Sequence, residues 1–336
     1  MSNLAPRMSR VAPSVGRLAR ATPRVAPASG LAARVASTAA CQFPTPQENT
    51  RRSFHNTPAR ASKRETIQNS PQVLPEFSLQ DKVIVVSGGA QGLGLVQAEA
   101  LLEAGAKVHV YDRQPEPGSG SSYQKVARRA REELGTSLTY HQVDVLDAAE
   151  KLHKVTEEIV AKEGHIDGLV AAAGIQQETP ALDYTAEDSN RMLGVNVTGA
   201  LMTAQAVAKH MYENDTPGSI VFIASMSGTI ANRGLICPVY NASKAAVLQL
   251  SRNLAMEWGI KNIRVNTISP GYIVTEMVQK LFEKFPDRAV EWPKQNMLNK
   301  LSKPEDYRGA AVFLLSDASR FMTGADLRID GGHAAW

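Results

Sequence analysis

Cysteine is scarce in this sequence, with only Cys41 and Cys237 among 336 residues. Two cysteines so far apart do not make the disulfide framework of a small secreted protein. If the segment that carries Cys41 is removed, a single thiol remains, as expected in a reducing compartment. We therefore expect Cys237 to be a small buried side chain.

Long apolar runs are also missing, so no membrane-spanning helix is expected. Acidic residues are nearly absent from residues 1–64, which hold eleven Lys or Arg and one acid, Glu48. The formal net charge of +4 therefore divides into +10 in this leader and −6 over residues 65–336. Because the basic charge is confined to the leader, the sequence does not indicate a nucleic-acid surface on the body.

The leader is rich in Arg, Ala, Ser and Pro, a composition typical of an organelle transit peptide and not of a secretory signal. Residues 52–57, RSFHNT, resemble the mitochondrial two-step processing pattern, which places cleavage near Ala61 and Ser62. We predict a mitochondrial matrix protein; a disordered basic tail on a cytoplasmic protein is the alternative. The predicted parts are a disordered transit peptide over 1–61, a linker over 62–77 and one domain over 78–336.

The body alternates short apolar runs with longer amphipathic stretches. Strands separated by helices of ten or more residues pair in parallel through right-handed crossovers. The pattern therefore predicts a single α/β domain, a doubly wound parallel sheet with helices on both faces. The expected strands are 83–86, 107–111, 138–143, 166–171, 218–224, 263–268 and 325–329, and the expected helices are a first one ending near residue 104, then 121–134, 148–163, 188–212, 238–258 and 303–315.

A glycine-rich turn lies between the first strand and the first helix. Glycines permit a tight turn and a close approach of the backbone to a pyrophosphate, which then rests on the helix amino terminus. The position after a buried strand, and not the glycines alone, makes this a candidate nucleotide site. Its predicted cofactor-binding residues are Ser87, Gly88, Gln91, Gly92, Leu93 and Gly94.

The preferred nucleotide is indicated at the end of the second strand. The carboxylate of Asp112 is placed to hydrogen-bond the adenosine ribose diol and to repel a 2′-phosphate. The neighbouring Arg113 is able to attract that phosphate, so NADP stays possible. We favour NAD.

Tyr240 and Lys244 are four residues apart in a predicted helix, a spacing that puts both side chains on one face. A phenol titrates near pH ~10 and is a weak acid-base catalyst at neutral pH. An ammonium beside it favours the phenolate and lowers the pKa of the phenol. The pair therefore predicts a proton-transfer site at the amino end of this helix.

In order, these motifs resemble those of the short-chain dehydrogenase/reductase family, in the form TGxxxGxG, here Ser87 to Gly94. The resemblance covers about residues 78–336 and implies a Rossmann-type fold. It implies four catalytic residues: Tyr240 as general acid/base, Lys244, Ser227 as donor to the substrate oxygen, and Asn196 as holder of a water. Tyr240 and Lys244 also contact the nicotinamide ribose, and the further cofactor residues that it implies are Asp144, Val145, Ala173, Gly174, Pro270, Gly271, Ile273 and Thr275.

Two departures from the family pattern stand out. Ser87 replaces the threonine of the loop and keeps a hydroxyl. Alanines at 171 and 172 replace two asparagines, one of which helps to join neighbouring strands in the family. These changes are expected to affect the stability of the sheet and not the chemistry.

The substrate follows less directly. The overall sequence pattern of the chain resembles that of fungal polyol and ketose dehydrogenases. This resemblance implies oxidation of a secondary alcohol such as D-arabinitol. Alternatives are a 3-oxoacyl thioester reductase of mitochondrial fatty acid synthesis and, from another class, a non-catalytic nucleotide-binding scaffold. Residues 272–301 lack a clean period and are expected to form the substrate loop.

The residues and the family resemblance also predict the partners of the chain. The histidines show no metal-ligand spacing, so no metal site is expected. The partners are then a small-molecule substrate and further copies of the chain, with neither nucleic acid nor membrane. The resemblance implies a homotetramer joined through the helices near 188–212 and 238–258 and the last strand.

Overall fold

The computed structural model describes residues 74–147 and 149–336. The predicted transit peptide, its cleavage site near Ala61 and the linker up to residue 73 lie outside this part. The end of the linker is described. It forms a 3₁₀ turn, Pro75–Phe77, and Phe77 packs against Phe313 with ring centroids 6.2 Å apart. Phe77, at the end of the predicted linker, therefore contacts the helix Arg308–Leu315 (α9) of the domain.

Seven parallel strands form one sheet in the order β3-β2-β1-β4-β5-β6-β7. All five residues of β1 are buried, as expected for a strand covered on both faces. This is the doubly wound sheet that the sequence predicts. The strands are β1 Val83–Ser87, β2 Lys107–Asp112, β3 Leu138–Gln142, β4 Gly168–Ala171, β5 Gly218–Ile223, β6 Ile263–Pro270 and β7 Asp326–Ile329.

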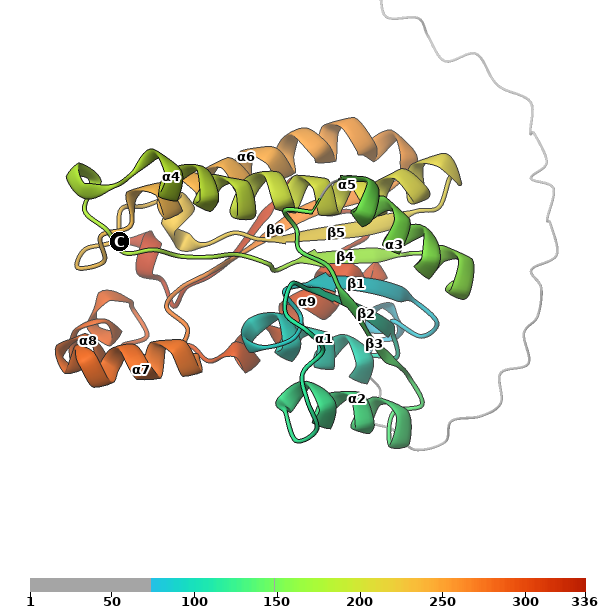
Figure 1. The fold of residues 1–336 in the computed structure, drawn as a ribbon, viewed down its shortest axis with the longest axis horizontal. Coiled ribbons are helices and arrows are strands. Elements are labelled where there is room, and N and C mark those ends of the chain that lie inside the picture. Colours follow the sequence, from blue (N-terminus) through green and yellow to red (C-terminus); the bar gives the residue numbers. More distant parts are fainter. Residues whose placement is uncertain (1–73, 148) are drawn as a thin grey trace, which may run out of the picture. The chain divides into compact units, whose positions relative to one another are not determined.

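Helices cover both faces of the sheet (Figure 1). One buried cluster joins the sheet to three helices: α3 Ala149–Glu163, α5 Ala200–Glu213 and α6 Pro238–Trp258. A second cluster joins the opposite face to α1 Gly92–Glu103, α2 Ser122–Glu132 and α9 Arg308–Leu315. The strands β2 and β3 are added on one side of β1, and β4 to β7 are added on the other side. Because the order of the strands reverses between β1 and β4, a crevice is expected at the carboxyl ends of these two strands.

The helix predicted over 188–212 consists of three pieces. It begins as α4 Ala186–Leu193, continues as a π-helical turn Gly194–Gly199 and ends as α5. Such π turns carry one extra residue per turn and often occur at functional sites. A smaller difference concerns the helix predicted over 303–315, where Pro304–Tyr307 is a 3₁₀ turn that precedes α9.

Residues 272–301, the predicted substrate loop, contain two short helices, α7 Glu276–Lys284 and α8 Pro286–Glu291. Both lie apart from the two helical layers, at one end of the sheet (Figure 1). Trp292, Leu235 and Cys237 form a small separate cluster here, against which Tyr240 and Tyr272 pack. Cys237 is thus the buried thiol that the sequence predicts.

Within the described ranges, no helix is both long and apolar enough to cross a membrane. In the same part of the chain, no three His, Cys, Asp or Glu side chains gather as a metal-binding group.

Candidate active site

The glycine-rich turn packs closely on the end of β4. Gly88 and Gly92 have positive φ values of 66° and 57°, which favour glycine. A Cβ atom on Gly88 would lie 2.8 Å from the Cα of Ala173, and one on Gly94 would collide with the carbonyl oxygen of Gly88. Side chains at these two positions would therefore push the turn away from the crevice.

The amino end of α1 is free to bind an anion. Gln91 is its N-cap and makes no side-chain hydrogen bond to the first turn, so the N–H groups there are not capped by a side chain. Gly92 has open space beyond its Cα, and Leu93 is half-buried. The turn and the helix end thus fit a pyrophosphate, as the sequence predicts. The hydroxyl of Ser87, in contrast, accepts a hydrogen bond from the N–H of Ala173 (3.3 Å) and ties β1 to the residues after β4.

Asp112 ends β2 beside this turn. Its Oδ2 accepts a hydrogen bond from the N–H of Ala90 (3.2 Å), so the carboxylate is held beside the glycine-rich turn. The side chain of Arg113 is exposed. The arrangement suits a ribose diol hydrogen-bonded to the carboxylate.

The residues after β3 form a tight turn. Asp144 accepts a hydrogen bond from the N–H of Leu146 through Oδ1 (3.0 Å), and Val145 is buried against Gly199 of the π turn. Asp144 therefore stabilises the turn after β3, and Val145 packs this turn against the π turn.

Asn196 lies in the π turn and is almost completely buried. Its Oδ1 accepts the N–H of Ile175 (2.8 Å), and its Nδ2 donates to the carbonyl of Ile175 (3.0 Å) and to the hydroxyl of Ser243 (3.0 Å). A Cβ on Gly174 would lie 3.4 Å from Asn196 Oδ1 and 3.7 Å from Lys244 Nζ. Asn196 thus connects the end of β4 to α6, with Gly174 and the lysine next to it.

Tyr240 and Lys244 lie on one face of α6, which begins at Pro238. The Nζ atom of Lys244 is 5.6 Å from the centroid of the Tyr240 ring and donates a hydrogen bond to the carbonyl oxygen of Ile223 (2.7 Å). The spacing therefore brings the pair together at the carboxyl end of β5, above the sheet.

The pKa values of Tyr240 and Lys244 differ from the expectation that the ammonium lowers the pKa of the phenol. Burial raises the pKa of Tyr240 to about 12, and burial lowers the pKa of Lys244 to about 8. Lys244 is not among the groups that shift the phenol. The physical reason is that both groups are withdrawn from water, while the ammonium is bonded to a backbone carbonyl and not to the phenol.

The two serines after β5 have different surroundings. Ser225 is close enough to Tyr240 for its hydroxyl to lower the pKa of the phenol, against the larger effect of burial. The hydroxyl of Ser227 instead donates to Asn232 Oδ1 (2.8 Å). Ser225 ends the extended chain and caps the 3₁₀ turn Met226–Gly228, whereas Ser227 lies inside that turn. Ser225, which the sequence analysis did not single out, thus lies beside the phenol, and the predicted Ser227 is hydrogen-bonded to Asn232.

Residues 270–275 leave β6 toward α7. Gly271 donates to the carbonyl of Ile329 (3.0 Å), and a Cβ there would lie 2.8 Å from the Cα of Asp330. Ile273 forms an isolated parallel bridge with Ser302. Thr275 caps α7 by accepting a hydrogen bond from the N–H of Val278 (3.3 Å). The predicted cofactor-binding stretch, which starts at Pro270, is therefore rigid.

Together these elements place a phenol, a hydroxyl and an ammonium beside a phosphate-binding turn, which is an arrangement for moving one proton next to a dinucleotide. The sequence pattern of the enoyl-(acyl carrier protein) reductase family matches residues 88–334. The chain belongs to the short-chain dehydrogenase/reductase family, and it is an oxidoreductase that acts on alcohols or the corresponding ketones.

Two relatives and one solved structure illustrate the similarity. A short-chain dehydrogenase/reductase, notP′, of Aspergillus versicolor is 39% identical over 77% of this chain and 89% of its own length. The ribulose-forming D-arabinitol 2-dehydrogenase of Candida tropicalis is 32% identical over 79% and 96%. A crystal structure of a gluconate 5-dehydrogenase from Burkholderia cenocepacia, in complex with NADP and tartrate, shares 31% identity over 78% and 98%, with a TM-score of 0.69.

Proposed function

We propose that the chain is a dehydrogenase that transfers a hydride from a secondary alcohol of a polyol, such as D-arabinitol, to NAD. The observation that carries the proposal is the position of Tyr240 and Lys244 on one face of α6, beside the end of β5. The similarity to a D-arabinitol 2-dehydrogenase supports the polyol.

The glycine-rich turn, Asp112 and Lys244 would hold the dinucleotide, which would supply the hydride chemistry when bound. Tyr240 takes the hydroxyl proton of the alcohol in oxidation and returns a proton to the ketone oxygen in reduction. Ser225 hydrogen-bonds the substrate oxygen where negative charge develops. Lys244 holds the nicotinamide ribose, and Asn196 connects the lysine to a water-mediated path for the proton. Because the pKa of Tyr240 is raised to about 12, the small phenolate fraction that oxidation uses grows with rising pH, while the protonated form that reduction uses stays nearly complete well below that pKa.

We infer NAD as the preferred nucleotide from the carboxylate of Asp112, which is held at the turn by Ala90. The NADP complex of the gluconate 5-dehydrogenase keeps the other nucleotide open within the family. The deciding measurement is the ratio of kcat/KM with NAD to that with NADP, in the wild type and in Asp112→Ala. A lower ratio in the variant supports the role of the carboxylate, and an unchanged ratio argues against it.

The activity itself is tested with residues 62–336, a panel of pentitols and hexitols, and both nucleotides. We expect NADH formation with D-arabinitol and loss of at least ~100-fold in kcat for Tyr240→Phe, the size of a general acid-base contribution. Failure to oxidise any polyol of the panel would refute the polyol proposal. Full activity of Tyr240→Phe would refute the mechanism.

A second candidate is reduction of a 3-oxoacyl thioester. The name of the matching family, enoyl-(acyl carrier protein) reductase, points to acyl thioesters as substrates, although an enoyl reductase reduces a carbon–carbon double bond and not a ketone. Turnover of an acetoacetyl thioester with NADPH at a higher kcat/KM than D-arabinitol with NAD would establish this alternative. The non-catalytic scaffold is set aside, because the family and its relatives are named as enzymes.

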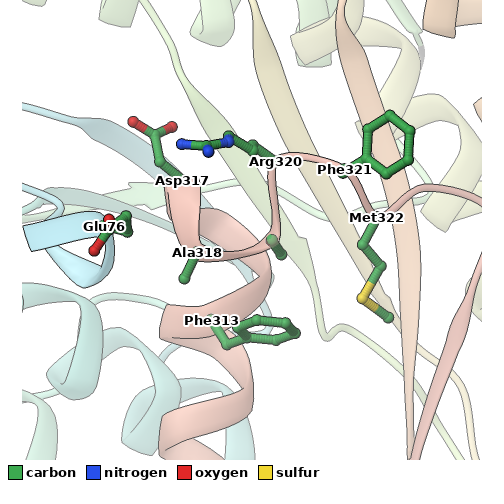
Figure 2. Close-up of a pocket in the computed structure, with 8 residues that line it drawn as sticks. Glu76, Phe313, Asp317, Ala318, Arg320, Phe321 and Met322 are labelled. Carbon is green, nitrogen blue, oxygen red and sulfur yellow. The ribbon is translucent and has the colours of Figure 1, made fainter. Parts of the chain in front are cut away.

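We also infer a homotetramer. The support is a fully exposed Phe321 next to the edge strand β7, together with exposed Met256 and Ile260 near the end of α6. Phe321, Phe313 and Met322 line a surface pocket of about 430 Å³, and Figure 2 shows these side chains. We also propose import into the mitochondrial matrix, which depends on the leader. The test compares the location in the cell of the full chain fused to a fluorescent reporter with that of the same fusion without residues 1–61.

A further inference from the structure

The catalytic phenol lies in the part of its helix that the helix itself holds least. Tyr240 belongs to the first turn of α6, and the first N–H groups of a helix have no partner within it. The side chain of the N-cap residue, Cys237, accepts no hydrogen bond from the N–H groups of that turn. Contacts with other segments are therefore needed to fix the backbone that carries the phenol.

Asn241, the residue after Tyr240, supplies such contacts through its side chain. Its Nδ2 donates to the carbonyl oxygen of Ile230 (3.0 Å) and to Oδ1 of Asn232 (3.1 Å). Its Oδ1 accepts a hydrogen bond from the thiol of Cys237 (3.1 Å). Because a backbone carbonyl only accepts, the amide has a single orientation in which all three bonds form. Asn241 thus joins the first turn of α6 to the loop that precedes it.

The connection continues from Asn232 to the two serines after β5. Asn232 Oδ1 also accepts the hydroxyl of Ser227 (2.8 Å), and the N–H of Ser227 donates to the hydroxyl oxygen of Ser225 (3.1 Å). Both serines are buried, so these bonds form where water competes little for them. Since Ser225 lies beside the Tyr240 phenol, the bonds that start at Asn241 lead back to the phenol.

The 3₁₀ turn Met226–Gly228 also touches α6 at another place. A Cβ atom on Gly228 would lie 2.8 Å from the backbone carbon of Lys244, which is one helical turn beyond Tyr240. One such contact sets a distance but leaves the 3₁₀ turn free to tilt against the helix. The bonds from Asn241 add a second fixed point, and two points determine the tilt.

We propose that Asn241 is a positioning residue for the proton transfer. Through the bonds described above, it keeps the Ser225 hydroxyl and the Tyr240 phenol at the separation that one substrate oxygen requires. Misplacement of a reacting group by about 1 Å costs roughly a hundredfold in rate, so a side chain that does not touch the substrate is able to control kcat. This inference rests on the role of Tyr240 in the proposed function and not on the identity of the alcohol.

The test compares Asn241→Ala with the wild type in the oxidation of D-arabinitol with NAD. We expect kcat to fall about tenfold and KM for NAD to stay within about twofold, because the nucleotide-binding turn is not changed. The solvent deuterium isotope effect on kcat should rise, since a misplaced phenol slows the proton step. A partly unfolded variant would lose kcat as well, but it would keep the isotope effect of the wild type.

Asn232→Ala interrupts the same set of bonds and should change kcat and the isotope effect in the same directions. The double variant with Asn241→Ala should lose little more than the larger single loss, because residues of one hydrogen-bond network do not act independently. Asn253→Ala is the matched control. It removes an exposed asparagine of the same helix, whose side chain accepts a bond from Gln249, and should leave kcat and the isotope effect unchanged.

Two results would overturn the inference: an unchanged kcat in Asn241→Ala, or a lower kcat with an unchanged isotope effect. If Tyr240→Phe is inactive in either case, the proposed function stands without the positioning role. If D-arabinitol is not oxidised, the polyol proposal fails, and reduction of an acetoacetyl thioester with NADPH tests the positioning role instead. Full activity of Tyr240→Phe removes the mechanism and the positioning role together.

Discussion

At the scale of single residues, the two serines after β5 show how a turn decides which hydroxyl meets the phenol. Ser225 lies beside Tyr240, and Ser227 donates to Asn232. We expect Ser225→Ala to lower kcat by ~10²–10³-fold, the cost of removing one donor to a developing oxyanion. Ser227→Ala should lower it by less than about tenfold, because it removes a neutral hydrogen bond to a positioning residue. Steady-state kinetics of the two variants measure this; a larger loss for Ser227→Ala would reverse the assignment.

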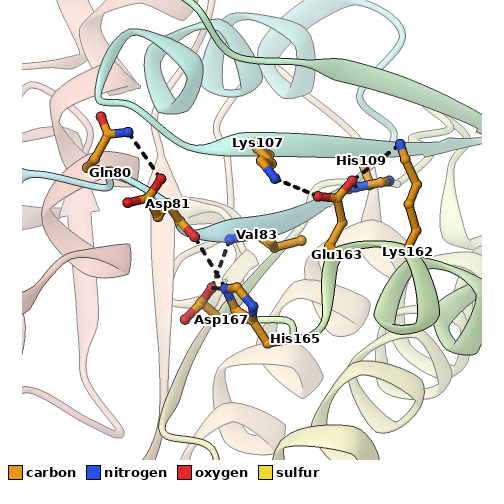
Figure 3. Close-up of polar contacts among 9 residues, drawn as sticks. All are labelled: Gln80, Asp81, Val83, Lys107, His109, Lys162, Glu163, His165 and Asp167. Atoms are coloured by element: carbon orange, nitrogen blue, oxygen red, sulfur yellow. Dashed lines mark hydrogen bonds and ion pairs between the residues drawn. The ribbon is translucent and has the colours of Figure 1, made fainter.

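A second residue-scale feature lies away from the crevice, on β2 (Figure 3). His109 is almost fully buried, bonded to His141 (2.9 Å) and 3.5 Å from a carboxylate oxygen of Glu163. Glu163 also pairs with Lys107 (2.8 Å) and with Lys162 (3.2 Å). Burial and the neighbouring His141 lower the pKa of His109 to about 4, despite the opposing carboxylate.

This lowered pKa predicts a loss of stability in mild acid. Between pH 6.5 and about 4 the unfolded chain binds a proton at this histidine that the folded chain does not bind. The free energy of unfolding should therefore be fully retained above pH 6.5 and fall by about 2 kcal/mol at pH 5. Urea unfolding at pH 7.5 and 5 measures the fall, which His109→Gln should reduce. The half-exposed His165, changed to Gln, is the control; an equal pH dependence in wild type and His109→Gln would contradict the prediction.

At the scale of elements, a bidentate ion pair attaches the substrate segment to the loop after β4. Arg288 of α8 donates to both carboxylate oxygens of Glu178 (2.9 and 2.6 Å), 110 residues away, and its guanidinium lies over the Phe285 ring (4.6 Å). The pair therefore joins two segments that border the catalytic compartment.

We expect Arg288→Ala to raise KM for the alcohol about fivefold with a smaller change in kcat, because the partly exposed pair is worth about 1 kcal/mol. Arg288→Lys should not restore KM, since an ammonium does not make the two parallel bonds. Arg131→Ala, which removes an exposed arginine paired only with its neighbour Glu132, serves as control. An unchanged KM in Arg288→Ala would show that the segment is held by its aromatic contacts alone.

At the scale of the whole molecule, exposed apolar side chains support the proposed homotetramer. Phe321→Asp should convert the assembly to smaller species, because it places a charge where an aromatic ring is expected to be buried between copies. Light scattering on the purified protein gives the mass. Leu182→Asp changes an equally exposed apolar side chain in another turn and should leave the mass unchanged. A wild type that is monomeric at micromolar concentration would refute the homotetramer.

Much of the fold could be predicted from local patterns. Apolar runs such as that of β1, together with the glycines that end the helices, predicted the ends of the strands to within about two residues. Such short apolar runs are typical of buried parallel strands and of few other structures. The division of residues 186–213 into α4, a π turn and α5 was not predicted. In the π turn, Asn196 is hydrogen-bonded to the backbone of Ile175. This contact joins two separate segments, and the hydrophobic period of a helix carries no information about it.

By itself, the sequence determined the order of the motifs, the parallel α/β architecture and the common face of Tyr240 and Lys244, because helix and strand periods are properties of neighbouring residues. Only the tertiary structure decided that Ser225 lies beside the phenol and that burial governs the pKa values of the pair. These outcomes depend on desolvation and on contacts between segments distant in the chain. Such quantities arise only when the sheet, α6 and the substrate segment are packed together.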